Sequence, residues 1–311
     1  MLSRTALNLY WMGRYVERAE FTARLLEATI RLDSLAPHPA GAAAWTSALA
    51  VATAEHGFAE TGDSITPLNI SRYLALEQGN PSSIRCCLDT ARTNARAVRT
   101  ALSREAWEAI NRAWMNIRGR TSPGGAQATL NLVDQVKAEA RGFEGALHRM
   151  LHNEPSWFIR LGAAIERADN SARLLDVKYH LLLPEGAEVG GAIDRDQWTT
   201  ILHTVSAVTA YRWLYREGLK PWLVAELLIL RSELPRSLAA SVEEIVTLLT
   251  ALSKRSGKQG EADRLARHRL SALRQTNIEQ IVQGGLHEYL QTFVAENVKL
   301  DQAIAQQFRF A

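Results

Sequence analysis

The chain has 311 residues, of which 47% are hydrophobic and 22% are charged, a composition typical of a globular protein with a substantial core. Its 36 Lys and Arg residues against 33 Asp and Glu residues leave a formal charge of only +3. Charge therefore predicts neither a nucleic-acid partner nor an anionic membrane. The two cysteines, Cys86 and Cys87, are adjacent and cannot build a disulfide framework, which favours a reducing cytosol.

The first residues lack the features of a secretion signal. The apolar positions before Gly13 are soon followed by Arg14, Glu17 and Arg18, and no uninterrupted apolar core or cleavage site is present. No run reaches the roughly 18 apolar residues that a transmembrane helix needs. We therefore expect a cytoplasmic protein without a membrane partner.

Hydrophobic residues recur with the spacing of helices along the whole chain, and the alternation of strands is nearly absent. Breaks occur at clusters of Gly, Pro, Asn and Asp, which end helices. The sequence predicts an all-α fold. In chain order, the predicted helices cover residues 3–35, 45–59, 68–78, a segment after Pro81 to residue 101, 103–117, 129–152, 156–183, 197–216, 222–232, 235–254, 261–274 and 277–308.

The first helix is repeated in the second half of the chain. Residues 13–27 match residues 162–176, 149 positions later, and both begin with Gly and contain Glu-Arg-Ala followed by an acid. Two further matches keep nearly the same offset, residues 44–49 with 197–202 and residues 74–84 with 228–238. We expect a helical bundle built from two duplicated, related halves, residues 1–155 and 156–311, packed as one compact unit.

Each copy of this helix carries a stripe of charged residues on one side, because a helix turns about 100° per residue. An exposed acid–arginine pair four residues apart contributes only about 0.2–0.5 kcal/mol, too little to explain why charges recur in both copies. The stripes consist of Glu17, Glu20, Arg24 and Glu27 in the first copy, and of Glu166, Asp169, Arg173 and Asp176 in the second.

Two interpretations of the stripes stay open. The charges form a structural ion-pair network or a solvated surface, or they line a polar cleft in which carboxylates act as acids and bases and arginines bind an anion. If the halves pack about a pseudo-two-fold axis, the stripes meet and form one site. The candidate catalytic residues are Glu17, Glu20, Glu166 and Asp169, and the candidate substrate-binding or anion-binding residues are Arg14, Arg18, Arg24, Arg167 and Arg173.

Other chemistries find little support in the sequence. A di-iron bundle needs Glu-x-x-His, but acids stand where the histidines would be required. Glu144, His148 and His152 have the spacing of ligands on one helical face, although a polar outer surface is the favoured interpretation, so we predict no metal site. Motifs for a nucleophilic serine or for nucleotide phosphates are missing, and the sequence leaves the cofactor unknown.

Several motifs resemble those of the bacterial alpha-E family, an all-helical domain of undetermined biochemistry. Residues 1–26 resemble its start, with Glu17, Arg18, Glu20 and Arg24 retained. Asn-Pro-Ser-Ser-Ile-Arg at 80–85, Leu-Pro-Arg-Ser-Leu at 234–238 and Gly-Leu-His-Glu-Tyr-Leu at 285–290 are similar to later motifs, so the resemblance spans the chain. Leu7 and Phe21 depart from the family pattern, which has polar residues there.

The resemblance implies partners more than a reaction. Alpha-E proteins are encoded beside, or fused to, circularly permuted ATP-grasp proteins and transglutaminase-like proteins, a combination that implies chemistry on the amide bonds of peptides. The expected function is a helical accessory or binding component of such a system, in which the paired Glu/Arg stripes contact a peptide or a partner. Two alternatives stay open, a stand-alone enzyme of amide-bond chemistry with Glu acid/base pairs and a structural interaction scaffold.

Overall fold

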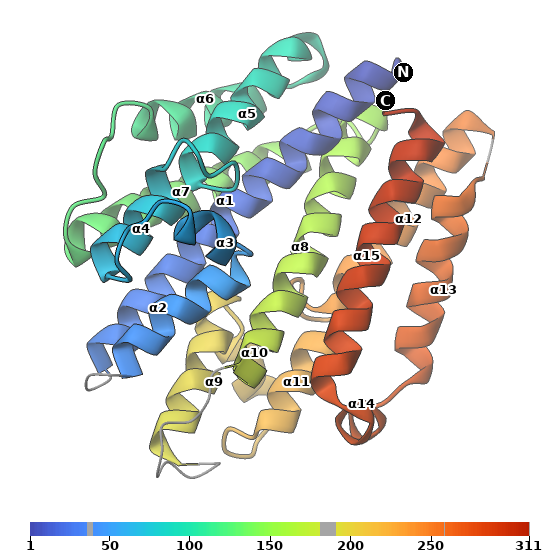
Figure 1. Cartoon of the computed structure of the whole chain (residues 1–311). Coiled ribbons are helices and arrows are strands. Elements are labelled where there is room, and N and C mark those ends of the chain that lie inside the picture. Colours follow the sequence, from blue (N-terminus) through green and yellow to red (C-terminus); the bar gives the residue numbers. More distant parts are fainter. Residues whose placement is uncertain (36–39, 181–190, 258, 311) are drawn as a thin grey trace.

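The computed structural model describes residues 1–35, 40–180, 191–257 and 259–310 (Figure 1). These residues form fifteen α-helices and one 3-10 helix at Arg99–Ala101, and no strand, so the predicted all-α fold is confirmed. The helices are α1 (Ser3–Leu35), α2 (Ala40–Val51), α3 (Glu55–Ala59), α4 (Pro67–Leu76), α5 (Ile84–Ala97), α6 (Arg104–Ile117), α7 (Ala126–His148), α8 (Glu154–His180), α9 (Ala192–Thr204), α10 (Val208–Leu214), α11 (Pro221–Leu230), α12 (Leu238–Ser256), α13 (Glu261–Gln275), α14 (Ile278–Gly284) and α15 (Leu286–Phe308).

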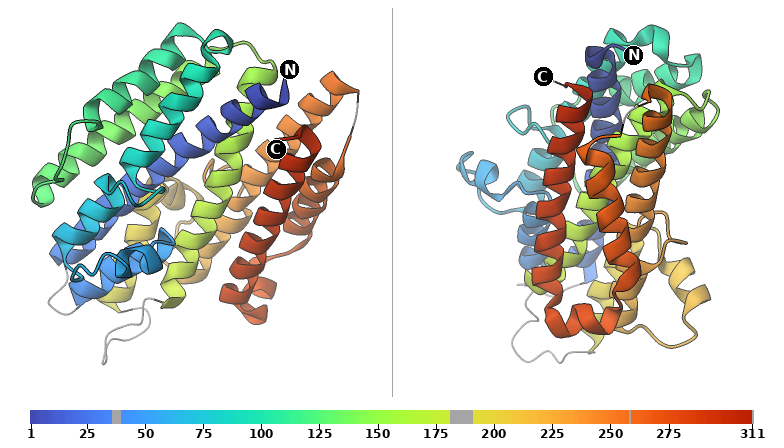
Figure 2. Two further views of the ribbon diagram at one scale, coloured as in Figure 1. Left: turned by 45° about the horizontal axis from the view of Figure 1, so that its top comes forward. Right: turned by 90° about the vertical axis from the view of Figure 1, so that its right-hand side faces the viewer.

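The two long helices α1 and α8 lie at the centre of the molecule and pack on each other along their length (Figures 1 and 2). Helices α5 and α7 pack on α1, with α6 behind them. Helices α12 and α15 pack on α8 in the same manner, with α13 behind them. Helices α2 and α9 each contact both central helices at the end away from the two termini (Figure 1). The central pair contributes to both hydrophobic clusters of the core, with the first half of each helix in one cluster and the second half in the other.

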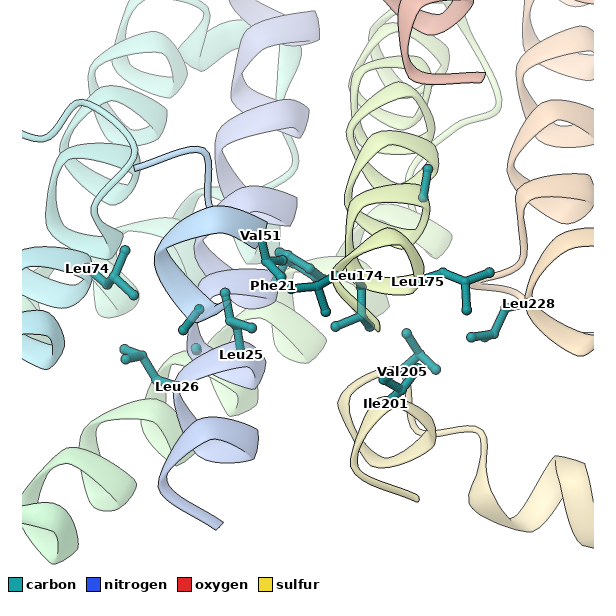
Figure 3. Packing of buried hydrophobic residues seen from close by; sticks show 14 of the residues in the cluster. Phe21, Leu25, Leu26, Val51, Leu74, Leu174, Leu175, Ile201, Val205 and Leu228 are labelled. Carbon is teal, nitrogen blue, oxygen red and sulfur yellow. The ribbon is translucent and has the colours of Figure 1, made fainter. Parts of the chain in front are cut away.

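The core explains why α1 and α8 occupy the centre. Leu9, Met12 and Leu26 on α1 and Ile159 and Leu161 on α8 are completely buried. Burial of one such side chain stabilises the fold by roughly 1.5–3 kcal/mol, so these helices lose most by facing water. Figure 3 shows one part of this core, where Phe21 and Leu25 of α1 approach Leu174 of α8, Val51 of α2 and Ile201 of α9.

Helix starts follow from the local sequence. The Thr66 hydroxyl accepts a hydrogen bond from the amide of Asn69, with Pro67 in the first turn of α4. The hydroxyls of Ser83 and Ser237 cap α5 and α12 in the same way. Such caps satisfy amides that have no partner within the helix.

Corresponding helices of the two halves hold corresponding positions. Near the far end of α1, Glu27 accepts a hydrogen bond from Lys137 of α7 at 2.7 Å. Near the end of α8, Asp176 lies 2.6 Å from Nδ1 of His287 on α15. Helix α15 thus occupies against α8 the place that α7 occupies against α1. This is the arrangement expected of a duplication, which itself stays a prediction, as does the division at residues 155 and 156.

Two predicted helices, 45–59 and 197–216, are each broken into two. Thr53 and Ser206 have positive φ angles of 53° and 57° just after α2 and α9. In both places the backbone closes a Schellman motif, with Ala54 N bonded to Leu49 O and Ala207 N bonded to Leu202 O. Neither break was predicted, because this position normally carries glycine.

Three other predictions of helix extent need correction or fall outside the described residues. The predicted helix 277–308 is interrupted at Gly285, where φ is 95°, and the helix predicted to reach His152 ends at His148. Of the break that Pro and Gly predict at residues 37–41, residues 37–39 lie outside the described residues, and residues 40–41 belong to α2. The end of the helix predicted at 181–183, with most of the loop that follows, also lies outside the described residues. None of the helices described is both long and apolar enough to span a bilayer.

Candidate functional site

The central helices touch backbone to backbone at two glycines. A Cβ atom on Gly13 would lie 2.0 Å from the carbonyl oxygen of Ile159, and one on Gly162 would lie 2.0 Å from that of Tyr10. The two contacts are reciprocal, since Ile159 and Gly162 stand 149 residues after Tyr10 and Gly13. Only glycine permits this approach, and the approach brings the charged side chains on either side of the crossing within reach of the opposite helix.

Each central helix carries a Glu-Arg dipeptide at the crossing, and the dipeptides are cross-paired. Oε2 of Glu17 accepts a hydrogen bond from Nη2 of Arg167 at 2.9 Å. The reciprocal Glu166 accepts two from Arg18, from Nε at 2.6 Å and from Nη2 at 3.0 Å. Glu17 and Glu166 are only 5% and 3% exposed. Buried ions of opposite charge are tolerable only when paired in this way.

A second arginine completes each pair. Nη1 of Arg236, in the loop before α12, donates to Oε1 of Glu17 at 2.7 Å, and its Nη2 donates to Glu20 at 2.9 Å. On the other side, Nε of Arg14 donates to Glu166 at 2.9 Å and its Nη1 donates to Asp301 of α15 at 2.8 Å. All four oxygens of the two central glutamates therefore accept hydrogen bonds from guanidinium groups.

The pairing fixes the charge state of the central glutamates. Burial opposes the charge on Glu17, but Arg167 and Arg236 outweigh burial and lower the pKa of Glu17 to about 2. Burial likewise opposes the charge on Glu166, and Arg18 and Arg14 lower its pKa all the same. A carboxylate held so far below neutral pH is a weak proton acceptor.

The next acid–arginine pair along each helix differs between the halves. Nε of Arg24 donates to Glu20 at 2.9 Å, and its Nη1 donates to the hydroxyl of Ser206 at 2.7 Å. Nε of Arg173 donates to Asp169 at 2.7 Å, but within the described residues its terminal nitrogens donate no hydrogen bond. The side chain of Arg24 is 10% exposed and that of Arg173 is 31% exposed.

Two cavities flank the crossing. The first, of about 370 Å³, lies on the Glu166 side between α1, α8 and α15. Its polar lining joins charged groups to hydroxyl and amide groups, and apolar patches come from Phe21, Val51 and Leu74. A pocket of this size suits a small molecule or a short peptide segment. The polar residues of its wall are Arg14, Arg18, Thr22, Thr53, Asn80, Ser82, Glu166, Asp169, Asn170, Arg173, Asn297 and Asp301.

The second cavity, of about 440 Å³, lies on the Glu17 side against α7. Ala163 stands there in the place that Arg14 takes in the first cavity, and Phe143 and Leu147 make the wall more apolar. His148 and Glu144 reach its rim, whereas His152 lies beyond the end of α7 and shares no helical face with them. The described residues contain no group of three or more side chains placed to hold a metal ion.

The structure brings most of the predicted residues together. Glu17, Arg18, Glu166 and Arg167 meet directly, Glu20 joins them through Arg236, and Arg14 joins through Glu166. Arg24 joins the cluster through its hydrogen bonds to Glu20. Asp169 and Arg173 lie further along α8, pair with each other and make no hydrogen bond to the cluster among the described residues.

Sequence reasoning missed four participants. Arg236 lies in the segment 228–238 that matches 74–84, so the repeat could have indicated it. Thr53 and Ser206 also stand at matching positions, but nothing in the sequence marks their backbone conformation. Asp301, which also accepts a hydrogen bond from the Tyr10 hydroxyl, belongs to a segment without any recognised match.

The fold and the site define an all-helical protein organised around two cross-paired Glu-Arg dipeptides, the only two in the chain. The chain belongs to the Alpha-E family, described as a predicted alpha-helical domain with a conserved ER motif, and the match covers residues 1–308. No curated protein and no solved structure matches it.

Proposed function

We infer that this protein is a cytoplasmic binding component of a system that makes or modifies peptides together with a circularly permuted ATP-grasp protein and a transglutaminase-like protein. The chain's role is to hold a peptide in the first cavity, and the cross-paired Glu-Arg dipeptides keep that cavity in shape. The resemblance to alpha-E proteins supplies the partners, and the chemistry of the cavity wall supports the ligand.

The observation that carries this proposal is the contrast between the paired glutamates and the cavity beside them. Glu17 and Glu166 have all their oxygens occupied and their pKa values lowered, so they serve to position helices. The wall of the first cavity, by contrast, includes the amide of Asn170, whose Nδ2 atom is buried and has no hydrogen-bond partner among the described residues. A buried donor without a partner costs roughly 1–3 kcal/mol, which a bound carbonyl group would recover.

The enzyme alternative keeps one candidate of the four predicted carboxylates. Glu17, Glu20 and Glu166 accept hydrogen bonds on both oxygens. Asp169 alone has an oxygen that accepts none from the described residues, and it lines the first cavity. An acid–base role in this chain would therefore fall to Asp169.

The test reconstitutes the three proteins and measures partner binding and modified peptide for two variants. Asn170→Leu removes the unpartnered amide, so we expect normal folding and partner binding but a loss of product. Unchanged product would refute a role for the cavity and leave the scaffold alternative. Asp169→Asn separates the classes, because a binding component keeps much of its output whereas an enzyme that uses this acid loses it while still retaining peptide.

A further inference from the structure

Each half has an arginine and a hydroxyl residue at matching positions near the end of its charged stripe, but the two are hydrogen-bonded to each other in only one half. In the Glu20 region, Nη1 of Arg24 donates to the hydroxyl of Ser206, 2.7 Å away. The matching residues in the other half are Arg173 and Thr53, and neither the terminal nitrogens of Arg173 nor the hydroxyl of Thr53 makes a hydrogen bond within the described residues. Both residues line the first cavity.

A second matching pair shows the same difference. The hydroxyl of Ser171 donates to the backbone oxygen of Arg236 at 2.8 Å. Its counterpart, Thr22, is buried at the wall of the first cavity, and its hydroxyl makes no hydrogen bond among the described residues. The buried amide nitrogen of Asn170 likewise has no hydrogen-bond partner in the described part of the chain. These unpaired nitrogen and hydroxyl groups therefore all belong to residues that line the first cavity.

The backbone at Thr53 is also costly. A β-branched residue with φ near +53° is a strained exception at a position where glycine is normally found. Ser206 has the same conformation, and there the hydroxyl accepts the hydrogen bond from Arg24. In the first half the equivalent residue is exposed and lines the first cavity instead.

The unpaired groups of the first cavity are mainly donors. Among the described residues, Arg173 offers two terminal nitrogens and Asn170 an amide nitrogen, and Thr22 and Thr53 offer hydroxyls that donate or accept. The unpaired oxygens are one of Asp169 and that of the Asn170 amide. A planar guanidinium with two unpaired terminal nitrogens matches the two oxygens of a carboxylate. The cavity then continues along α8 from Arg173 to Glu166, about 10 Å at 1.5 Å per residue, which is room for more than a free ion.

We propose that the first cavity binds peptides by a free terminal carboxylate. The carboxylate accepts hydrogen bonds from Arg173 and Thr53, as the Ser206 hydroxyl accepts one from Arg24 on the other side. This rests on the proposed function and narrows it to substrates with an unblocked carboxyl end. The rest of the chain lies toward Arg14, beside Asn170 and Ser82, with apolar side chains against Phe21 and Leu74.

The experiment exposes the full-length protein to two tripeptide libraries of identical random sequence, one with free carboxyl ends and one amidated, and measures retained peptide by mass spectrometry. We expect free acids to be enriched at least tenfold over amides, as the loss of one charge-assisted pair implies. Equal retention of both libraries would overturn the carboxylate inference and leave peptide binding intact. Retention of neither would overturn both proposals.

Variants locate the contact. Arg173→Gln is expected to abolish the preference for free acids, whereas Arg160→Gln, on the same helix, 32% exposed and paired with Glu244, is a matched control that keeps it. Thr53→Gly is expected to raise the melting temperature, because glycine relieves the strain, and to weaken retention. If Arg173→Gln keeps the preference, or if inorganic phosphate displaces the peptides as well as a free tripeptide does, the proposal is wrong.

Discussion

The two sides of the α1–α8 crossing carry charged residues at matching positions but differ in how many of their hydrogen-bond donors are paired within the protein. On the Glu17 side, Arg236 bridges two glutamates and the Nη1 atom of Arg24 donates to Ser206, although the Nε atom of Arg167 is buried without a partner among the described residues. On the Glu166 side, Arg14 and Arg18 pair with the glutamate, but the terminal nitrogens of Arg173, beside a polar cavity, have no partner in the described part of the chain. This difference is the basis of our proposal that the Glu17 side maintains the fold while the Glu166 side binds a ligand.

The largest effect is expected at the two glycines where the backbones of α1 and α8 touch, a feature common to both sides of the crossing. Gly13→Ala and Gly162→Ala each force a Cβ atom into a backbone carbonyl, so we expect each to lower the free energy of unfolding by more than about 4 kcal/mol. Urea denaturation followed by circular dichroism measures this. The control, Gly142→Ala on the exposed face of α7 with open space around it, should raise stability by about 0.5–1 kcal/mol. Near-normal stability of either crossing variant would contradict the close contact.

The next largest effect is expected at the paired glutamates. Glu17→Gln and Glu166→Gln leave buried arginines with one charge uncompensated, at a cost of about 3 kcal/mol each. Because the two sites are reciprocal, the losses should be similar. Glu108→Gln serves as the control, since Glu108 pairs with exposed Arg104 on the surface and should hardly affect stability. A large inequality between the two central variants would break the proposed equivalence.

Acid should destabilise the crossing in a defined range of pH. The pKa of Glu17 falls from 4.5 when unfolded to about 2 when folded, so the unfolded chain binds more protons in between and stability rises with pH. This contribution, on the order of 3 kcal/mol, is complete above pH 4.5 and is lost as pH falls toward 2. Unfolding curves between these values measure it, and Glu17→Gln should flatten the dependence. An unchanged slope in that variant would contradict the assignment.

The sequence predicts the positions of the helices well, but it does not predict the breaks that depend on how the helices pack. The spacing of apolar residues and the N-caps at Ser83 and Ser237 are local, so element type follows from them. Thr53 and Ser206 broke two predicted helices because their left-handed backbone is imposed by packing, against the preference of their side chains. Local sequence therefore misses the breaks that tertiary structure imposes.

Most residues of the candidate site could be predicted from the sequence, but which glutamate pairs with which arginine could not. The repeat identified Glu17 and Glu166 as related residues, but a helix's own sequence gives only which side chains share a face. That each glutamate pairs with the other helix's arginine depends on the depth of the contact at the glycines. Asp301 could not be foreseen, because its place depends on α15 packing beside Tyr10 at the far end of the chain.

The smallest expected effect separates the two halves most directly. Ser206→Ala removes the acceptor of Arg24 Nη1 and leaves a buried charged donor with only a 3.5 Å contact to Thr204 O, so we expect a loss of about 1–2 kcal/mol. Thr53→Ala removes a hydroxyl without a described partner and should change stability by less than about 0.5 kcal/mol. Both variants keep a Cβ atom at the same positive φ, so backbone strain nearly cancels between them.

Thermal unfolding of these two variants, alone and with the free-acid tripeptide library, gives the decisive difference. If the first half is open, ligand stabilises the wild type and the Ser206→Ala variant alike but stabilises the Thr53→Ala variant less, because a ligand raises stability only through the contacts it makes. If Thr53→Ala costs as much as Ser206→Ala without ligand, then the Thr53 hydroxyl already has a partner within the protein. Both hydroxyls would in that case be hydrogen-bonded within the protein, and the difference between the two sides would not support ligand binding at Thr53.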